Sequence, residues 1–73
     1  MFVEYKDIDG DSGVAAYEIG DDYIAVRFKT DRVYIYSYAT AGEYNVETMK
    51  QLAKLGDGLN RYIMKYCKTL YVK

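Results

Sequence analysis

The sequence predicts one α+β domain, in which a three-stranded antiparallel meander is followed by two helices packed on one face of the sheet. Residues 14–38 contain three short segments of alternating polarity, separated by turn residues. Residues 45–68 contain two segments in which apolar residues recur at helical spacing. Strands followed by helices are typical of α+β folds. All 73 residues fit a single domain, of which residues 1–13 form a polar N-terminal segment.

The strands are predicted by turn residues and by alternation. Val14 to Ile19 forms a short strand that ends at the turn Gly20-Asp21-Asp22. Residues 23–29 and 32–38 then alternate strictly between polar and apolar or aromatic side chains, as half-buried strands do. Because few residues separate these two segments, we expect them to form a hairpin.

The register of this hairpin decides which side chains face the core. A loop of two or four residues would collect the aliphatic residues on one face, through the pairs Phe28–Val33, Val26–Ile35 and Ile24–Ser37. The other face would then carry one cation and four phenol rings: Tyr23, Arg27, Tyr34, Tyr36 and Tyr38. A three-residue loop would mix the two faces, because a shift of one residue turns over every side chain of a strand. We therefore expect the first register.

Two amphipathic helices follow the hairpin. Asn45 is the expected N-cap of the first helix, and Gly56 is the residue expected to end it. The apolar stripe of this helix is Val46, Met49, Leu52, Ala53 and Leu55. Asp57 is expected to cap the second helix, whose apolar stripe is longer and more regular: Leu59, Tyr62, Ile63, Tyr66, Cys67 and Leu70.

The order of these elements and two short motifs resemble the KTSC domain, a small domain found at the C-terminus of some lysyl-tRNA synthetases and as free-standing bacterial proteins. The first motif, after a strand that ends in Phe28, is Tyr34-Ile35-Tyr36. The second is the segment from Gly56 to Ile63, in which Gly56, Asn60 and Ile63 match the family pattern. The resemblance covers residues 13 to 66. It implies this fold, and it implies RNA binding, the activity suggested for the family.

The composition argues against catalysis. The chain has no histidine, which is the commonest general base. Its one cysteine, Cys67, lies on the apolar stripe of the second helix, where a buried structural thiol is expected rather than a nucleophile. No glycine-rich phosphate loop or nucleophile motif is present in the sequence. We expect a non-catalytic protein without a cofactor.

One acidic segment is close to a calcium-binding pattern. Asp7, Asp9, Asp11 and Glu18 match the first, third, fifth and last ligand positions of an EF-hand loop. Ser12 occupies the position that requires glycine, and a strand is predicted where the pattern needs a helix. A solvated acidic loop is therefore the expected interpretation, and a weak calcium site is the alternative.

The tyrosine face of the hairpin is the main candidate for a binding site. Aromatic rings beside cations on a sheet stack the bases of single-stranded RNA in several binding folds. Three further cations, in a C-terminal stretch without acids, either meet phosphates or complement the dipole of their own helix: Arg61, Lys65 and Lys68. An exposed aromatic patch also marks protein interfaces, so a protein-interaction or homodimerising module is the alternative.

Charge and targeting signals narrow the remaining classes. The net charge is −1, but residues 1–31 carry −5 and residues 32–73 carry +4. The sequence has no apolar run near the roughly 18 residues of a membrane span, and no secretory signal at its N-terminus. A single cysteine allows no intramolecular disulfide. We expect a cytoplasmic protein without a membrane partner.

Overall fold

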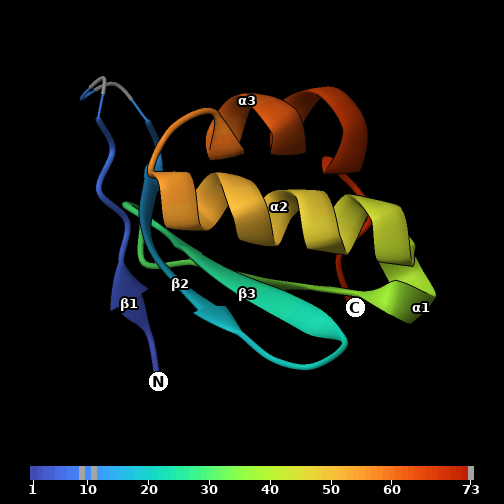
Figure 1. Cartoon of the computed structure of the whole chain (residues 1–73). Coiled ribbons are helices and arrows are strands. Elements are labelled where there is room, and N and C mark those ends of the chain that lie inside the picture. Colours follow the sequence, from blue (N-terminus) through green and yellow to red (C-terminus); the bar gives the residue numbers. More distant parts are fainter. Residues whose placement is uncertain (9, 11, 73) are drawn as a thin grey trace.

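The computed structural model describes residues 1–8, 10 and 12–72, and it confirms the α+β class (Figure 1). One antiparallel sheet contains four strands in the order of the sequence: β1 (Val3–Glu4), β2 (Val14–Ile19), β3 (Tyr23–Phe28) and β4 (Val33–Ser37). Consecutive strands are neighbours, so the sheet is a meander. The prediction of three strands misses β1, because two residues are too few to show alternation.

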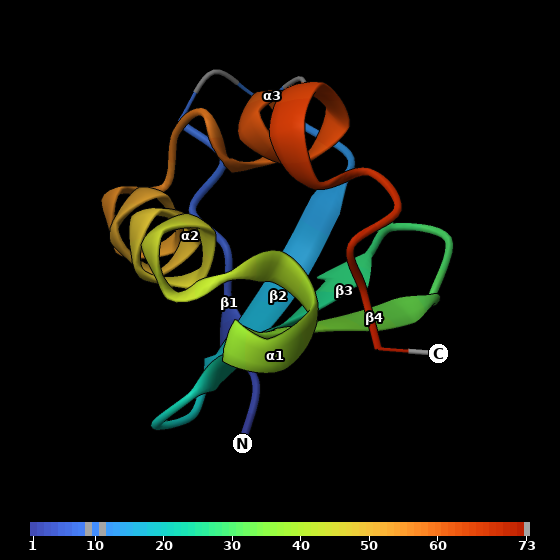
Figure 2. The same cartoon turned by 90° about the vertical axis from the view of Figure 1, so that its right-hand side faces the viewer.

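The helical segments cover one face of this sheet and leave the other face open (Figures 1 and 2). They are α1 (Tyr38–Ala41), α2 (Glu43–Leu55), α3 (Leu59–Tyr62) and the π-helix η1 (Ile63–Cys67), which continues α3. The two predicted helices correspond to α2 and to α3–η1. The additional turn α1 lies where a loop is expected, and it is stabilised by a capping box between Ser37 and Thr40.

The predicted ends of the helices are partly wrong. α2 begins at Glu43 after Gly42, so Asn45 is not its N-cap; the Asn45 amide instead donates to the carbonyl oxygen of Ala41. Asp57 does not cap α3, whose N-cap is Gly58 without a side-chain hydrogen bond. Gly56 does end α2 in the left-handed conformation, as predicted.

The wider turn of η1 keeps one narrow stripe of the last helix in the core. Leu59, Ile63 and Cys67 follow one another at intervals of four residues, and all three are fully buried. In a regular α-helix this interval advances around the axis, because a turn takes 3.6 residues. The wider turn of η1 compensates for this advance. Tyr66, which the sequence places on the same stripe, is instead exposed.

The core lies between the sheet and the helices. Ile24 and Val26 of β3 belong to the same buried cluster as Val46 and Met49 of α2 and the stripe of α3–η1. Such a cluster of fully buried aliphatic side chains is the main stabilising element of a domain this small.

The hairpin β3–β4 has a register one residue away from the predicted one. Ile24 pairs with Tyr36, and Val26 pairs with Tyr34. Residues 29–31 form the loop: the Asp31 amide donates to the carbonyl oxygen of Phe28 at 2.8 Å, and Asp31 has φ of 70°. This is the three-residue hairpin loop with a left-handed third residue, a conformation that aspartate tolerates.

Candidate nucleic-acid interface

The predicted tyrosine face does not exist, because the observed register turns β4 over. Tyr36 is only 1% exposed and lies in the core on the same side as Ile24. Val33 and Ile35, which were expected to face the helices, are 47% and 41% exposed on the open side of the sheet. A tyrosine ring buries a large area, so Tyr36 can fill the core beside Ile24.

The remaining tyrosines of the predicted face have different surroundings. The Tyr34 ring lies 4.7 Å from the ring of Tyr71, in the segment after the last helix. Tyr38 opens α1, and its hydroxyl donates to the carboxylate of Glu47. That hydrogen bond is the main cause that raises the pKa of Tyr38 to about 12. The four rings therefore form no common platform.

Tyr23 and Arg27 stay together on the open face, as predicted, but both already have partners. The Tyr23 hydroxyl donates to Glu18 at 2.7 Å, and this hydrogen bond raises the pKa of Tyr23. The Arg27 guanidinium lies 3.8 Å from the Asp31 carboxylate and 5.9 Å from the centre of the Phe2 ring.

Two of the three predicted phosphate-binding cations line a groove on the helical side of the molecule. We call it the aromatic–basic groove: it has a volume of about 290 Å³ and is lined by Leu52 of α2 and by Gly58, Arg61, Tyr62, Lys65 and Tyr66. Lys68, the residue directly after η1, is exposed, but it does not line the groove. The structure therefore sets two of these cations beside tyrosines of their own helix, whereas the sequence predicts aromatic partners on the sheet.

The aromatic partners are Tyr62 and Tyr66. Their ring centres lie 4.8 Å apart with a tilt of 48° between the planes. The Tyr62 hydroxyl donates to the side-chain oxygen of Asn45 at 2.7 Å, which fixes this ring against α2. Burial is the main cause that raises the pKa of Tyr62. The Tyr66 ring is 54% exposed, and the Lys65 ammonium lies 5.4 Å from its centre.

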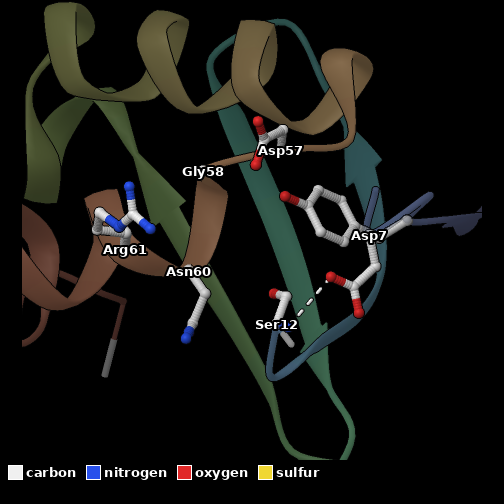
Figure 3. A pocket seen from close by; sticks show the side chains of 7 residues that line it. Asp7, Ser12, Asp57, Gly58, Asn60 and Arg61 are labelled. Atoms are coloured by element: carbon white, nitrogen blue, oxygen red, sulfur yellow. Dashed lines mark hydrogen bonds between the residues drawn. The ribbon is translucent and has the colours of Figure 1, made fainter. Parts of the chain in front are cut away.

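A second hollow, the polar cavity, lies beside the groove and shares Gly58 and Arg61 with it (Figure 3). Its volume is about 170 Å³, and its other lining residues are Tyr5, Asp7, Ser12, Asp57 and Asn60. The cavity brings the loop before β2 against the start of α3, and a hydrogen bond of 2.9 Å from the Ile8 amide to the Gly56 carbonyl oxygen fixes this approach. Sequence spacing gives no signal for such a meeting, because the two segments are far apart in the chain.

The weak calcium site gains no support from the residues that the structure describes. The Asp7 carboxylate accepts from the Ser12 amide and from the Lys29 ammonium, both at 3.1 Å. Glu18 lies on β2 and pairs with Tyr23 and with the N-terminal ammonium. Asp9 and Asp11 lie outside the described residues. Within those residues, no three acidic or thiol side chains form a group that could hold a metal ion.

Cys67 is fully buried, as predicted for a structural thiol, and burial raises the pKa of its thiol. A high thiol pKa leaves little of the reactive thiolate at neutral pH. Across the described residues, no helix has the length and apolar character needed to cross a membrane.

No family model matches the chain, and neither a curated protein nor a solved structure matches it. The resemblance to the KTSC domain therefore stays a prediction.

Proposed function

We propose that the chain is a non-catalytic binding module for single-stranded RNA, and that the strand lies in the aromatic–basic groove between α2 and α3–η1. The observation that carries this proposal is the exposed ring of Tyr66, beside which Tyr62, Lys65 and Arg61 line the same groove. Proteins that bind single strands combine aromatic stacking with a positively charged groove along the backbone.

Stacking on Tyr66 supplies the attraction to the bases. A tyrosine ring is rigid and loses little rotational freedom when a base covers it. Tyr62 is held by its hydrogen bond to Asn45 and supports the edge of the Tyr66 ring. One stacked base contributes about 1–3 kcal/mol to binding.

The cations of the last helix supply the attraction to phosphates. The sequence has no acid after Asp57, so Arg61, Lys65 and Lys68 are not opposed by a carboxylate on their own helix. The attraction is local, because the net charge of the chain is −1. Salt screens charges over about 10 Å at 0.1 M, so the affinity should fall as salt is added.

Single-stranded RNA fits this groove better than a duplex. In a double helix the faces of the bases are stacked on each other and are closed to side chains. A ring such as that of Tyr66 can only be covered by a base that is free of its neighbours. The groove therefore selects unpaired segments rather than helical RNA.

Fluorescence anisotropy of a labelled octauridine tests this proposal. We expect Tyr66→Ala to weaken binding about tenfold, which corresponds to about 1.4 kcal/mol and lies within the range for one stacked base. Lys65→Gln should also reduce the slope of log affinity against log salt concentration by about 1, as expected for the loss of one phosphate contact. Met64→Ala is the matched control, because Met64 is similarly exposed on η1 but does not line the groove. An octauridine that does not bind at low salt, or equal losses in both alanine variants, would contradict the proposal.

The open face of the sheet favours a second candidate function, homodimerisation. The exposed Val33 and Ile35 lie next to Arg27 and Ala25 of β3, and Ala25 is buried among its neighbours. Glu4 and Arg27 flank Ala16 in one cross-strand row, so the face carries both signs of charge. A two-fold axis can set the acid of one copy against the base of the other, as self-complementary interfaces do.

Sedimentation velocity tests this second candidate. We expect a species of twice 8.4 kDa to appear as the protein concentration rises, and Ile35→Glu to abolish it, because a charge cannot be buried there without a partner. Leu55→Glu is the control, since Leu55 is also an exposed aliphatic residue but lies on α2 rather than on the sheet. A monomer at every concentration would rule this interface out.

A further inference from the structure

The polar cavity contains three side chains whose polar groups the fold itself does not use. Among residues 1–8, 10 and 12–72, the side chains of Asp57, Asn60 and Arg61 form no hydrogen bond or ion pair. Figure 3 shows these side chains around the hollow, with Arg61 on the side opposite to Asp7. Three unused polar groups from one short segment therefore converge on one hollow.

The other lining groups are already engaged. Asp7 accepts hydrogen bonds from the Ser12 amide and the Lys29 ammonium, so its charge is balanced. The Ser12 hydroxyl oxygen accepts from the Val14 amide at 3.1 Å, and the Tyr5 hydroxyl oxygen accepts from the Leu59 amide at 3.3 Å. The recognition chemistry of the cavity thus depends on Asp57, with Asn60 and Arg61 beside it.

The Asp57 carboxylate determines what kind of ligand group can enter. A carboxylate only accepts hydrogen bonds, so the ligand must present donors, and a phosphate is repelled. Within an RNA strand, guanine places two N–H donors side by side on its Watson–Crick edge, N1–H and N2–H, which match the two oxygens of a carboxylate. Uracil presents one N–H between two carbonyl oxygens, which Asp57 would repel. Adenine and cytosine present a single amino group beside an acceptor.

Size and position agree with a single base. The volume of about 170 Å³ is smaller than the roughly 300–1,000 Å³ of pockets for drug-sized ligands. Gly58 and Arg61 line both the cavity and the aromatic–basic groove. A nucleotide with its base in the cavity can therefore place its phosphate at Arg61, with the next base in the groove.

We propose that the polar cavity binds one guanine base of the RNA strand, with the Asp57 carboxylate accepting N1–H and N2–H of its Watson–Crick edge. This inference rests on the proposed function, because it places the strand in the adjoining groove. It makes the module selective for single-stranded RNA that contains an unpaired guanine.

Anisotropy titrations of the full chain with three labelled oligonucleotides test the inference. The probes are octauridine and the same strand with one central guanosine or one central inosine. We expect guanosine to raise the affinity about tenfold over octauridine, because a bidentate contact discriminates between bases on this scale. Inosine lacks the N2 amino group, so it should recover only part of this gain.

Two variants locate the effect. Asp57→Asn should remove the preference for guanosine, because an amide offers one acceptor oxygen instead of two. The affinity for octauridine should not fall, because the Asp57 carboxylate only repels uracil and phosphate. Asp31→Asn, at an exposed carboxylate of the β3–β4 loop, is the matched control and should keep the preference. Circular dichroism checks that both variants fold, and the inosine comparison on the unaltered chain tests the same contact without any substitution.

The outcomes separate this inference from the proposed function. Equal affinity for the three strands, with binding still lost in Tyr66→Ala, overturns the guanine site and leaves the groove intact. Failure of all three strands to bind at low salt overturns both. A guanosine preference that survives Asp57→Asn overturns the role of Asp57.

Discussion

Gly56 is the residue at which the N-terminal segment meets the turn between α2 and α3. It ends α2 with φ of 81°, and its carbonyl oxygen accepts from the Ile8 amide at 2.9 Å. A Cβ atom at this position would lie 2.6 Å from the Cβ of Lys6, too close for any real contact. The close approach of the N-terminal loop to the start of α3, and with it the polar cavity, therefore depends on the absence of a side chain here.

We expect Gly56→Ala to lower the free energy of unfolding by more than the roughly 1–2 kcal/mol that a left-handed conformation costs an L-residue. The excess comes from the contact with Lys6, whose Cβ cannot move without its backbone. Gly58→Ala is the matched control, because Gly58 has φ of 82° and its added Cβ would meet only Leu52 at an ordinary 3.8 Å. Urea denaturation measures both, and equal losses would show that the approach of Lys6 is not tight.

At the scale of elements, the sequence predicts the strands and helices well and the hairpin register wrongly. Turn residues and alternation predict β2, β3 and β4, since these depend on neighbours along the chain. The register depends on the loop, and residues 29–31 contain no glycine to indicate a left-handed position. The predicted register assumes that only aliphatic residues face the helices. The core also contains the tyrosine rings of Tyr5 and Tyr36, so this assumption selects the wrong register.

In the last helix, the sequence indicates the cations of the candidate site but not its exposed tyrosine ring. The acid-free stretch after Asp57 draws attention to Arg61, Lys65 and Lys68, and all three are exposed in the structure. Periodicity also predicts Tyr62 and Tyr66 as core residues, because it assumes a regular α-helix throughout. The π-helix narrows the buried stripe to Leu59, Ile63 and Cys67 and leaves the Tyr66 ring for the surface. A change of helix type cannot be read from apolar spacing alone.

At the scale of the whole molecule, the ion pairs leave several cations of the described chain without an acidic partner, and three of these lie on or directly after the last helix. Four acids of the described residues form ion pairs: Glu18 with the N-terminal ammonium, Asp7 with Lys29, Asp31 with Arg27 and Glu47 with Lys50. In the part of the chain that the structure describes, Arg61 and Lys65 of α3–η1 form no ion pair, and neither does Lys68, the residue after η1. Positive charge therefore gathers beside the groove although the chain as a whole carries −1.

The buried Tyr36 ring also makes the stability of the whole molecule fall at alkaline pH. Burial is the largest cause that raises the pKa of Tyr36 to about 12, whereas an unfolded tyrosine titrates near about 10. Since the folded pKa is the higher one, the neutral ring stabilises the fold fully below pH about 10. This contribution is lost as the pH rises toward about 12, because the unfolded chain releases its proton first.

We therefore expect the urea midpoint of the protein to fall between pH about 10 and about 12, and Tyr36→Phe to make this fall shallower. The fall should not vanish, because the hydrogen bond to Glu47 raises the pKa of Tyr38 to about 12 as well. Circular dichroism at a series of pH values measures both proteins, with their midpoints at pH 8 as the reference. Parallel curves for the two proteins above pH 10 would mean that the Tyr36 hydroxyl reaches water freely, which contradicts its place in the core.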